Sequence, residues 1–342
     1  MLSVVIPCFN EAETLVRLHD RITAEVAAAG ETCELIYVDD GSIDDTLAIL
    51  RKLAANDERV RYVAFSRNFG KEAAMYAGLR HTTGDAVIIM DADLQHPPEL
   101  ISQLVAMWHN GIDQVVARRN RAGDPATRTF LSKTFYRLVN RWIEVRLVDG
   151  AGDFRLISRP VVDAILTMPE YNRFSKAMFA WVGFDVAYIE YQNVSRQGGA
   201  TSWTFPKLVN YAMDGLLSFN NRPLRLAIYL GLFMSGLAVA YMLWIIGHSM
   251  VSGVDSPGYT TLLTAIVGLG GLNMIVVGVI GEYVGRIYYE VKRRPHFLLK
   301  EAHLPRTTSE PGSPEAQGVQ GWAGADPVPA PRRRTETTDL TA

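Results

Sequence analysis

Two carboxylates stand one residue apart directly after an apolar run. Asp91 and Asp93, in MDADLQHPPEL, follow the apolar residues 86–89. Like charges this close repel each other, so we expect a cation between them. Carboxylate oxygens suit Mg²⁺ or Mn²⁺, which usually share their coordination with substrate phosphates. Such a pair also arises by chance in surface turns, so its surroundings in the chain decide its meaning.

The elements that must position this pair are strands and helices in alternation. Strands are predicted at residues 2–7, 34–40, 60–65, 86–91 and 113–118, with helices at 11–29, at 44–55 and after Pro98. Near-continuous apolar strands that alternate with helices indicate an α/β fold with a mostly parallel, Rossmann-like sheet. The polar clusters CFNEAE, DDGSIDD, SRNFGKE and DADLQ follow the first four strands. They therefore fall at the edge where such sheets bind ligands.

The same positions exclude two common nucleotide sites. A dinucleotide oxidoreductase requires G-x-G-x-x-G after the first strand, where this chain reads PCFNEAE. The Walker loop G-x-x-x-x-G-K-[ST] is absent from the sequence as well. With a net charge of −2, the 342-residue chain has no global basic field for nucleic acid. A nucleotide diphosphate held through a metal fits the paired carboxylates best.

The cysteines and the first residues indicate the compartment. Cys8 and Cys33 are the only two cysteines in the sequence, which gives neither a disulfide framework nor a zinc pattern. This fits a reducing compartment. The opening MLSVVIPCFN lacks the positive n-region of a signal peptide.

Two later stretches are apolar enough to cross a membrane. Residues 224–247 carry one charge, Arg225, and residues 261–281 carry none. Each reaches the roughly 20 residues that a bilayer core requires, although a pair of buried core helices is the alternative. The connecting residues 248–260 lack Lys and Arg, whereas basic residues stand at positions 222, 225, 286 and 292–294. The positive-inside rule places both termini and the large N-terminal part in the cytoplasm.

The remaining segments complete the predicted organisation. Apolar residues at helical spacing in 205–217 indicate a helix that lies in the membrane interface, or one that packs on the soluble domain. The Pro- and Gly-rich tail is too polar to fold. The predicted boundaries are 1–203 for the catalytic domain, 204–222 for the juxtamembrane helix, 223–285 for two spans (224–247 and 261–284), 286–302 for a basic cytoplasmic segment and 303–342 for a disordered tail.

Several motifs together resemble a known family. VVIPCFNEAETL, IYVDDGSIDDT, SRNFGKEAAMYAGL and IIMDADLQHPPEL occur in this order. They resemble the inverting GT-A fold glycosyltransferases that include dolichol-phosphate mannose synthase. GAGDFRLISR, YNRFSKAMFAWVGF and GEYVGRIYYEVKRRPHF resemble bacterial polyprenyl-phosphate glycosyltransferases, including the GtrB-type bactoprenol glucosyltransferases. The resemblance covers roughly residues 2 to 300.

The resemblance assigns roles to the residues at the strand ends. Asp40 would read the base, although capping of the DDGS turn is an alternative role for this pair, chiefly for Asp39. Asp91 would serve both the metal and the nucleotide. The implied nucleotide-binding residues are Pro7, Phe9, Asn10, Glu11, Asp40, Lys71 and Asp91, and the implied ligands of Mg²⁺ or Mn²⁺ are Asp91, Asp93 and Gln95.

The resemblance also implies a phosphate-binding and catalytic set. Arg119, Arg128 and Arg196 match positions that face the phosphates, and guanidinium groups bind phosphate with two hydrogen bonds. Ser132 and Lys133 are candidates for the acceptor phosphate.

Asp153 matches the carboxylate that usually serves as the base in this family. The acceptor, however, is a phosphate monoester with a second pKa of about 6, so it is mostly a dianion at neutral pH. A nucleophile that arrives deprotonated has little need of a base. Two roles for Asp153 therefore remain open, either base or positioning group for an arginine or the sugar.

The predicted function is inverting transfer of a sugar from a nucleotide diphosphate sugar to polyprenyl phosphate, at the cytoplasmic face of the plasma membrane. UDP is the favoured nucleotide and glucose the leading sugar. A processive polysaccharide synthase would require Q-x-x-R-W and more spans, where this chain has KAMFAWVG. A catalytically silent membrane scaffold is the other alternative. The resemblance also implies a homo-oligomer, with a tetramer as the leading candidate.

Overall fold

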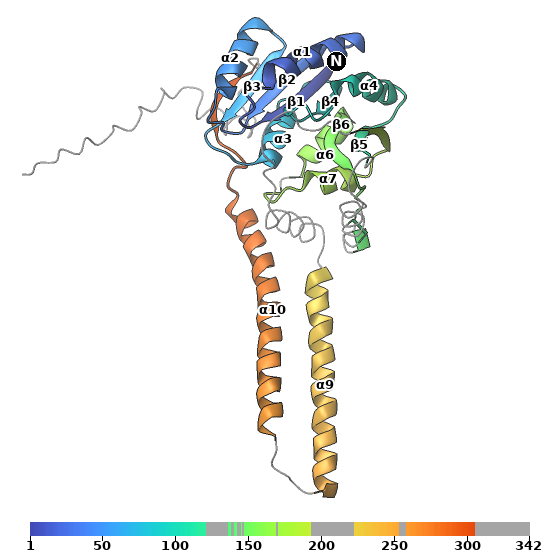
Figure 1. Cartoon of the computed structure of the whole chain (residues 1–342), viewed down its shortest axis with the longest axis vertical. Helices are drawn as coiled ribbons and strands as arrows, with labels where there is room; N and C mark the ends of the chain where they lie inside the picture. Colours follow the sequence, from blue (N-terminus) through green and yellow to red (C-terminus); the bar gives the residue numbers. More distant parts are fainter. Residues whose placement is uncertain are drawn as a thin grey trace, which may run out of the picture. The chain divides into compact units, whose positions relative to one another are not determined.

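The computed structural model describes residues 1–120, 136–137, 140–141, 145, 147–168, 170–192, 222–252 and 258–304 (Figure 1). The strands are β1 (Leu2–Cys8), β2 (Cys33–Asp39), β3 (Val60–Phe65), β4 (Ala86–Ile89), β5 (Gln114–Arg119), β6 (Ala151–Ser158), β7 (Val186–Tyr191) and β8 (Leu299–His303). The helices are α1 (Leu15–Ala28), α2 (Thr46–Asn56), α3 (Lys71–Arg80), η1 (Pro98–Leu100), α4 (Ile101–His109), α6 (Arg159–Leu166), α7 (Ser175–Trp181), α9 (Arg222–Ser252) and α10 (Tyr259–Lys292).

The strands form one sheet in the order β7-β5-β6-β4-β1-β2-β3-β8. The five predicted strands are confirmed as β1 to β5, and β4, β1, β2 and β3 run parallel. β6 is antiparallel to β4 and β5, and β8 is antiparallel to β3. The mostly parallel, Rossmann-like α/β fold is therefore confirmed, with two antiparallel strands that the sequence analysis did not predict.

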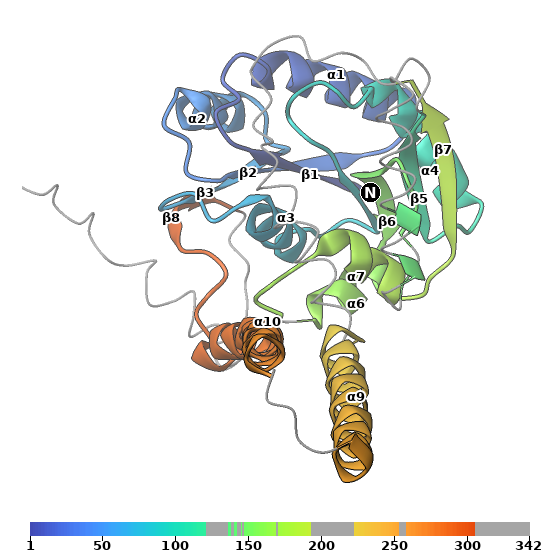
Figure 2. The same cartoon turned by 60° about the horizontal axis from the view of Figure 1, so that its bottom comes forward.

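Helices cover both faces of the sheet. Figure 2 shows α1, α2 and α4 on one face and α3, α6 and α7 on the other, and a buried apolar cluster lies on each side. In α1, the apolar face Leu15, Leu18, Ile22 and Val26 is at most 1% exposed. The central strands are buried over nearly their whole length, because both of their faces meet helices.

The chain returns to the sheet after α10. Residues 299–303, expected to belong to a basic segment and the start of a tail, form the edge strand β8 beside β3. Just before β8, Phe297 packs on an apolar cluster and stacks on Phe65, with ring centroids 4.8 Å apart. Arg51 of α2 donates two hydrogen bonds to Glu301, at 2.8 and 2.6 Å. The segment that follows the apolar helix is therefore an integral part of the α/β domain.

The two long helices correspond to the predicted spans. Within the described residues, one stretch is long and apolar enough to cross a membrane: Gly268–Lys292, 25 residues with a mean hydropathy of 1.4. None of it is buried in the protein, which argues against a core helix. α9 contains the shorter apolar stretch Tyr229–Tyr241 and contacts α10. The predicted interface helix at 204–222 lies outside the described residues up to Asn221.

Candidate active site

The polar loops after β1, β2, β3 and β4 meet at the carboxyl edge of the sheet, because these strands are parallel and adjacent. Hydrogen bonds join the first two loops. The Asn10 N–H donates to Ser42 Oγ at 2.9 Å, and the Ile43 N–H donates to Asn10 Oδ1 at 3.0 Å. Asn10 has a φ of 56°, a left-handed conformation that asparagine tolerates. These contacts fix the loop that contains three of the predicted nucleotide-binding residues, Phe9, Asn10 and Glu11, and the fourth, Pro7, lies near the end of β1.

The two aspartates that end β2 have different partners. Asp39 Oδ1 accepts the Ser42 N–H at 3.0 Å, so the turn-capping alternative is confirmed for Asp39. Asp40 is 4% exposed, and its carboxylate accepts the N–H groups of Phe69 at 2.6 Å and Gly70 at 2.9 Å. Burial raises the pKa of Asp40, and those backbone bonds oppose the rise. Asp40 thus holds the β3–α3 loop in place, and its role in reading a base stays a prediction.

Lys71, the first residue of α3, lies between two carboxylates. Its Nζ is 2.5 Å from Asp91 Oδ1 and 2.6 Å from Asp153 Oδ2. Burial would lower the pKa of Lys71, but the carboxylates of Asp153 and Asp91 outweigh it and raise this pKa. The ammonium group of Lys71 therefore joins Asp91 to Asp153, whereas a cation between Asp91 and Asp93 stays a prediction.

Asp153 reaches this position because β6 is inserted beside β4. The antiparallel register pairs Ile89 with Arg155, so Asp153 lies beyond the end of β4, next to Asp91. Burial would raise the pKa of Asp153, but Lys71 and Lys176 outweigh it and hold that pKa well below its usual range. Lys176 was not among the predicted site residues, although it stands in the YNRFSKAMFAWVGF motif that supported the family resemblance.

The loop after β4 is shaped around the predicted metal ligands. Asp93 Oδ1 accepts the Gln95 N–H at 3.0 Å, and Leu94 between them has a φ of 58°. His96 was also missed, although it directly follows DADLQ. Its ring stacks on Phe154 with centroids 5.1 Å apart, and its Nε2 lies 3.9 Å from Asp91 Oδ2.

The donor set at this loop fits a divalent ion that shares its ligands with a substrate. Among the residues that the structure describes, no three His, Cys, Asp or Glu side chains converge on one metal position. Mg²⁺ in nucleotide enzymes is usually held by one or two carboxylates and completed by phosphate oxygens and water. Asp91 and Asp93 supply such a pair, at the strand end where a diphosphate would lie.

Arg119 ends β5 and reaches the same region. In the sheet it pairs with Tyr191, whose ring lies edge-on to His96 with centroids 6.4 Å apart. Burial raises the pKa of the Tyr191 phenol, Arg119 opposes the rise, and the carboxylates of Asp91 and Asp93 add to it. A Cβ on Gly150 would lie 2.4 Å from the Arg119 carbonyl oxygen, so this turn requires glycine. The predicted residues Arg128, Ser132, Lys133 and Arg196 lie outside the described residues.

Comparison with known proteins decides the family. Residues 3–166 match glycosyl transferase family 2, and residues 222–287 match the GtrB C-terminal hairpin. The Bacillus subtilis protein CsbB, named as a glycosyltransferase, is 47% identical over 305 residues, which cover 89% of this chain and 93% of CsbB. This chain belongs to glycosyl transferase family 2.

Further likenesses of this glycosyltransferase include a bactoprenol glucosyl transferase of Shigella flexneri, derived from the SfII prophage. That protein is 40% identical over 303 residues, which cover 88% of this chain and 98% of its own length. The crystal structure of glucosyl-3-phosphoglycerate synthase from Mycobacterium tuberculosis is 22% identical, with a TM-score of 0.43, and covers 64% of this chain and 79% of that one.

The two family matches cover different parts of this glycosyltransferase. The family 2 match runs from β1 to the end of α6 and contains Lys71, Asp91 and Asp153. The hairpin match covers α9 and most of α10. The expected GT-A domain followed by a C-terminal helical hairpin is thereby confirmed.

Proposed function

We propose that this glycosyltransferase moves a sugar from a nucleotide diphosphate sugar to polyprenyl phosphate, with inversion at the anomeric carbon, at the cytoplasmic face of the plasma membrane. The observation that carries the proposal is the cluster of Asp91, Lys71 and Asp153 at the carboxyl edge of the sheet, in a chain with an apolar helical hairpin. The names of the bactoprenol glucosyl transferases support the lipid acceptor.

The donor nucleotide would lie over the loops after β1 and β2. Phe9 directly follows β1, and Ile43 lies in the loop after β2. Their side chains are 45% and 91% exposed, respectively. Such open apolar side chains offer a surface for a planar base. UDP is our preferred nucleotide and glucose our preferred sugar, and GDP-mannose is the main competitor. Lys71 would contact the nucleotide when the donor diphosphate enters beside Asp91.

Asp91 and Asp93 would hold Mg²⁺ or Mn²⁺, with Gln95 as a third ligand. When bound there, the metal would neutralise charge on the leaving diphosphate. Arg119, with Arg128 and Arg196, would face the phosphates, and Ser132 and Lys133 would receive the acceptor. Charged donors fixed in advance around a developing negative charge are the usual source of such catalysis.

The chemical step requires no proton to leave the acceptor. A phosphate oxygen attacks the anomeric carbon, the bond from that carbon to the diphosphate oxygen breaks, and its electron pair stays on the diphosphate. The acceptor is mostly a dianion at neutral pH, because its second pKa is about 6. Asp153 is a weak proton acceptor, since Lys71 and Lys176 keep its pKa low. We therefore assign Asp153 to the positioning of Lys71 rather than to proton removal.

The membrane orientation is part of the proposal. Both ends of the hairpin would face the cytoplasm, since the residues between the helices carry no Lys or Arg. A cysteine at Ser252 should then react with an impermeant thiol reagent added outside cells, and one at Ser309 should not. The native Cys8 and Cys33 are buried, which keeps the background low. Labelling at Ser309 alone would overturn the orientation.

An assay of nucleotide release tests the activity. The purified chain, given UDP-glucose, GDP-mannose and other nucleotide sugars in turn, should release nucleotide only when undecaprenyl phosphate is present, and should form one lipid phosphosugar. A polysaccharide product would show a processive synthase. Absence of release with every donor would favour the silent scaffold.

The molecular mass of the detergent-solubilised protein tests the proposed homo-oligomer and the tetramer.

A further inference from the structure

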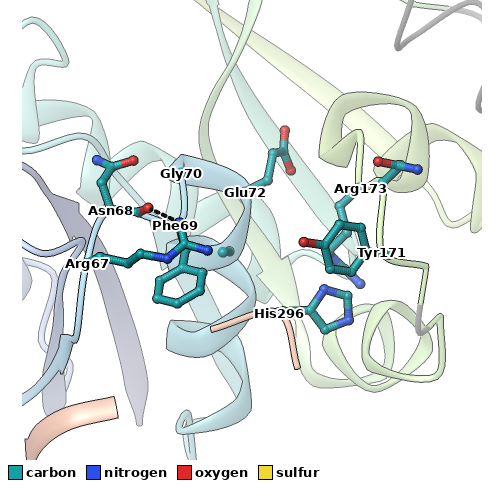
Figure 3. Close-up of a pocket in the computed structure, with 10 residues that line it drawn as sticks. Arg67, Asn68, Phe69, Gly70, Glu72, Tyr171, Arg173 and His296 are labelled. Carbon is teal, nitrogen blue, oxygen red and sulfur yellow. Dashed lines mark hydrogen bonds between the residues drawn. The ribbon is translucent and has the colours of Figure 1, made fainter. Parts of the chain in front are cut away.

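A second pocket lies beside the β3–α3 loop, on residues that the proposed reaction does not use (Figure 3). Its volume is about 360 Å³, at the small end of ligand pockets. Three separate segments form it: the β3–α3 loop with the start of α3, the residues before α7, and the residues after α10. Its lining is Arg67, Asn68, Phe69, Gly70, Glu72, Ala73, Tyr171, Asn172, Arg173 and His296.

The lining is basic. Figure 3 shows Arg67 on one side and Arg173 with His296 on the other. Glu72 supplies the one carboxylate of this lining, and its Oε2 already accepts the N–H of Ser175 at 3.1 Å and the Ser175 hydroxyl. The amide side chains of Asn68 and Asn172 add further donors. This set of groups suits an anion with several oxygens.

A hydrogen bond and an aromatic ring hold the side chain of Arg173 in one orientation. Its Nη1 donates to the Met168 carbonyl at 2.7 Å, and its guanidinium lies 4.3 Å from the centre of the Tyr76 ring. Its Nε is buried and has no hydrogen-bond acceptor among the described residues. Arg173 also lines the pocket, so an anion there can pair with the positive charge of its guanidinium group. Phosphate oxygens match a guanidinium held in one orientation.

The pocket is attached to the end of the apolar helix α10. The Tyr171 N–H donates to Glu290 Oε1 at 2.8 Å, and the Tyr171 ring stacks on Tyr289 with centroids 5.5 Å apart. His296 follows α10 by four residues and stacks on Tyr171 with centroids 5.8 Å apart. A phosphate that reaches this pocket is therefore near the point where the chain leaves its membrane-spanning helix.

We propose that this pocket binds the phosphate head group of an anionic glycerophospholipid, through Arg67, Arg173 and His296. The proposal rests on the membrane location of α10 in the proposed function, and it does not depend on the sugar or the nucleotide. Free inorganic phosphate shares the same chemistry, and the experiment separates the two sources. The bound head group would fix the catalytic domain to the end of α10, because the pocket joins both.

The experiment measures thermal unfolding of the full chain in neutral detergent. The probes are dioleoyl phosphatidylglycerol, dioleoyl phosphatidylcholine and inorganic phosphate. Phosphatidylglycerol should raise the unfolding midpoint of the wild type, and the other two should not. Arg173→Met should weaken the apparent affinity for phosphatidylglycerol by roughly 10- to 100-fold, as the loss of a charge-assisted pair predicts. Arg67→Met, on an exposed loop, should weaken it as well.

Arg17→Met is the matched control, because Arg17 is exposed on α1 and does not line the pocket. It should respond to phosphatidylglycerol as the wild type does. Equal responses in Arg173→Met, Arg67→Met and Arg17→Met would overturn the proposal. Equal protection by inorganic phosphate would overturn the lipid source. Sugar transfer by the wild type without phosphatidylglycerol tests the proposed function separately, so the two proposals fail independently.

Discussion

Lys71 Nζ and Asp153 Oδ2 lie 2.6 Å apart, although 82 residues separate them in the chain. The same ammonium group is 2.5 Å from Asp91 Oδ1. Lys71 therefore forms ion pairs with two carboxylates, Asp91 after β4 and Asp153 on β6. A residue of α3 thus neutralises part of the negative charge that Asp91 and Asp153 bring together. A divalent ion that takes Asp91 as a ligand would share this carboxylate with Lys71 or displace the ammonium towards Asp153.

Lys71→Met should lower kcat/KM for the nucleotide sugar by about 10²-fold or more, the scale for loss of one fixed charge at a developing anion. Without the ammonium, Asp91 and Asp153 repel each other and the diphosphate loses a cation. Steady-state kinetics with saturating polyprenyl phosphate measures the effect. Lys52→Met, on an exposed position of α2, is the control and should keep normal rates. Normal rates in Lys71→Met would show that the ion pair is purely structural.

Asp91→Asn and Asp93→Asn should each weaken Mn²⁺ binding in the presence of UDP by at least about tenfold, since each removes one anionic ligand. Electron paramagnetic resonance of free Mn²⁺ gives this affinity without any turnover. EDTA should abolish transfer by the wild type. Asp20→Asn, exposed on α1, should bind Mn²⁺ normally. Full activity in EDTA would mean that the motif has no metal to hold.

Asp153→Asn separates a base from a positioning group. A true general base contributes about 10²–10⁴-fold. If the acceptor attacks as a dianion, kcat/KM for polyprenyl phosphate should rise up to pH ~6–7 and level off above it, in both the wild type and the variant. We expect this shared profile. An acidic limb in the wild type that disappears in Asp153→Asn would restore the base.

Phe297→Ala should destabilise the catalytic domain by about 2–3 kcal/mol, because a partly buried aromatic ring leaves a cavity against Phe65. The neighbouring Leu298 is 52% exposed, so Leu298→Ala is the matched control and should cost little. Thermal unfolding midpoints compare the two variants. Similar midpoints would show that the segment after α10 only lies against the sheet without stabilising it.

The free energy of unfolding should decrease as the pH decreases, and His81 should contribute to this loss. Burial, with Arg80 beside it, lowers the pKa of His81 from 6.5 to about 4. The folded state therefore favours the neutral ring, and the unfolded state takes up a proton first as the pH falls. The contribution of His81 is fully present above pH 6.5 and is lost as the pH falls towards 4. Between pH 7.5 and 5, the unfolding midpoint of the wild type should decrease more than that of His81→Asn. An equal decrease would contradict this role.

Local pattern was enough to predict five of the eight strands of the described sheet and the edge at which their polar loops meet. Alternation of apolar strands with helices gave five strands close to their observed ends, and parallel pairing then required their polar loops to meet. The length of two apolar stretches, one with the single charge Arg225 and one with none, predicted the two long helices. Glu282 and Arg286 lie four residues apart on α10, and Arg286 Nη2 donates to Glu282 Oε1 at 3.3 Å.

Tertiary structure decided the partners of Asp91 and Asp153. Lys71 meets Asp91 and Asp153 because β6 enters the sheet antiparallel beside β4, and strand order of this kind depends on packing between distant segments. Asp40 holds the backbone N–H groups of Phe69 and Gly70, a contact between two loops that local sequence does not reveal. Strand β8 also escaped prediction, because its pairing with β3 spans more than 230 residues. Sequence determines periodicity, composition and local caps, whereas contacts between distant residues depend on the register and order that the whole core selects.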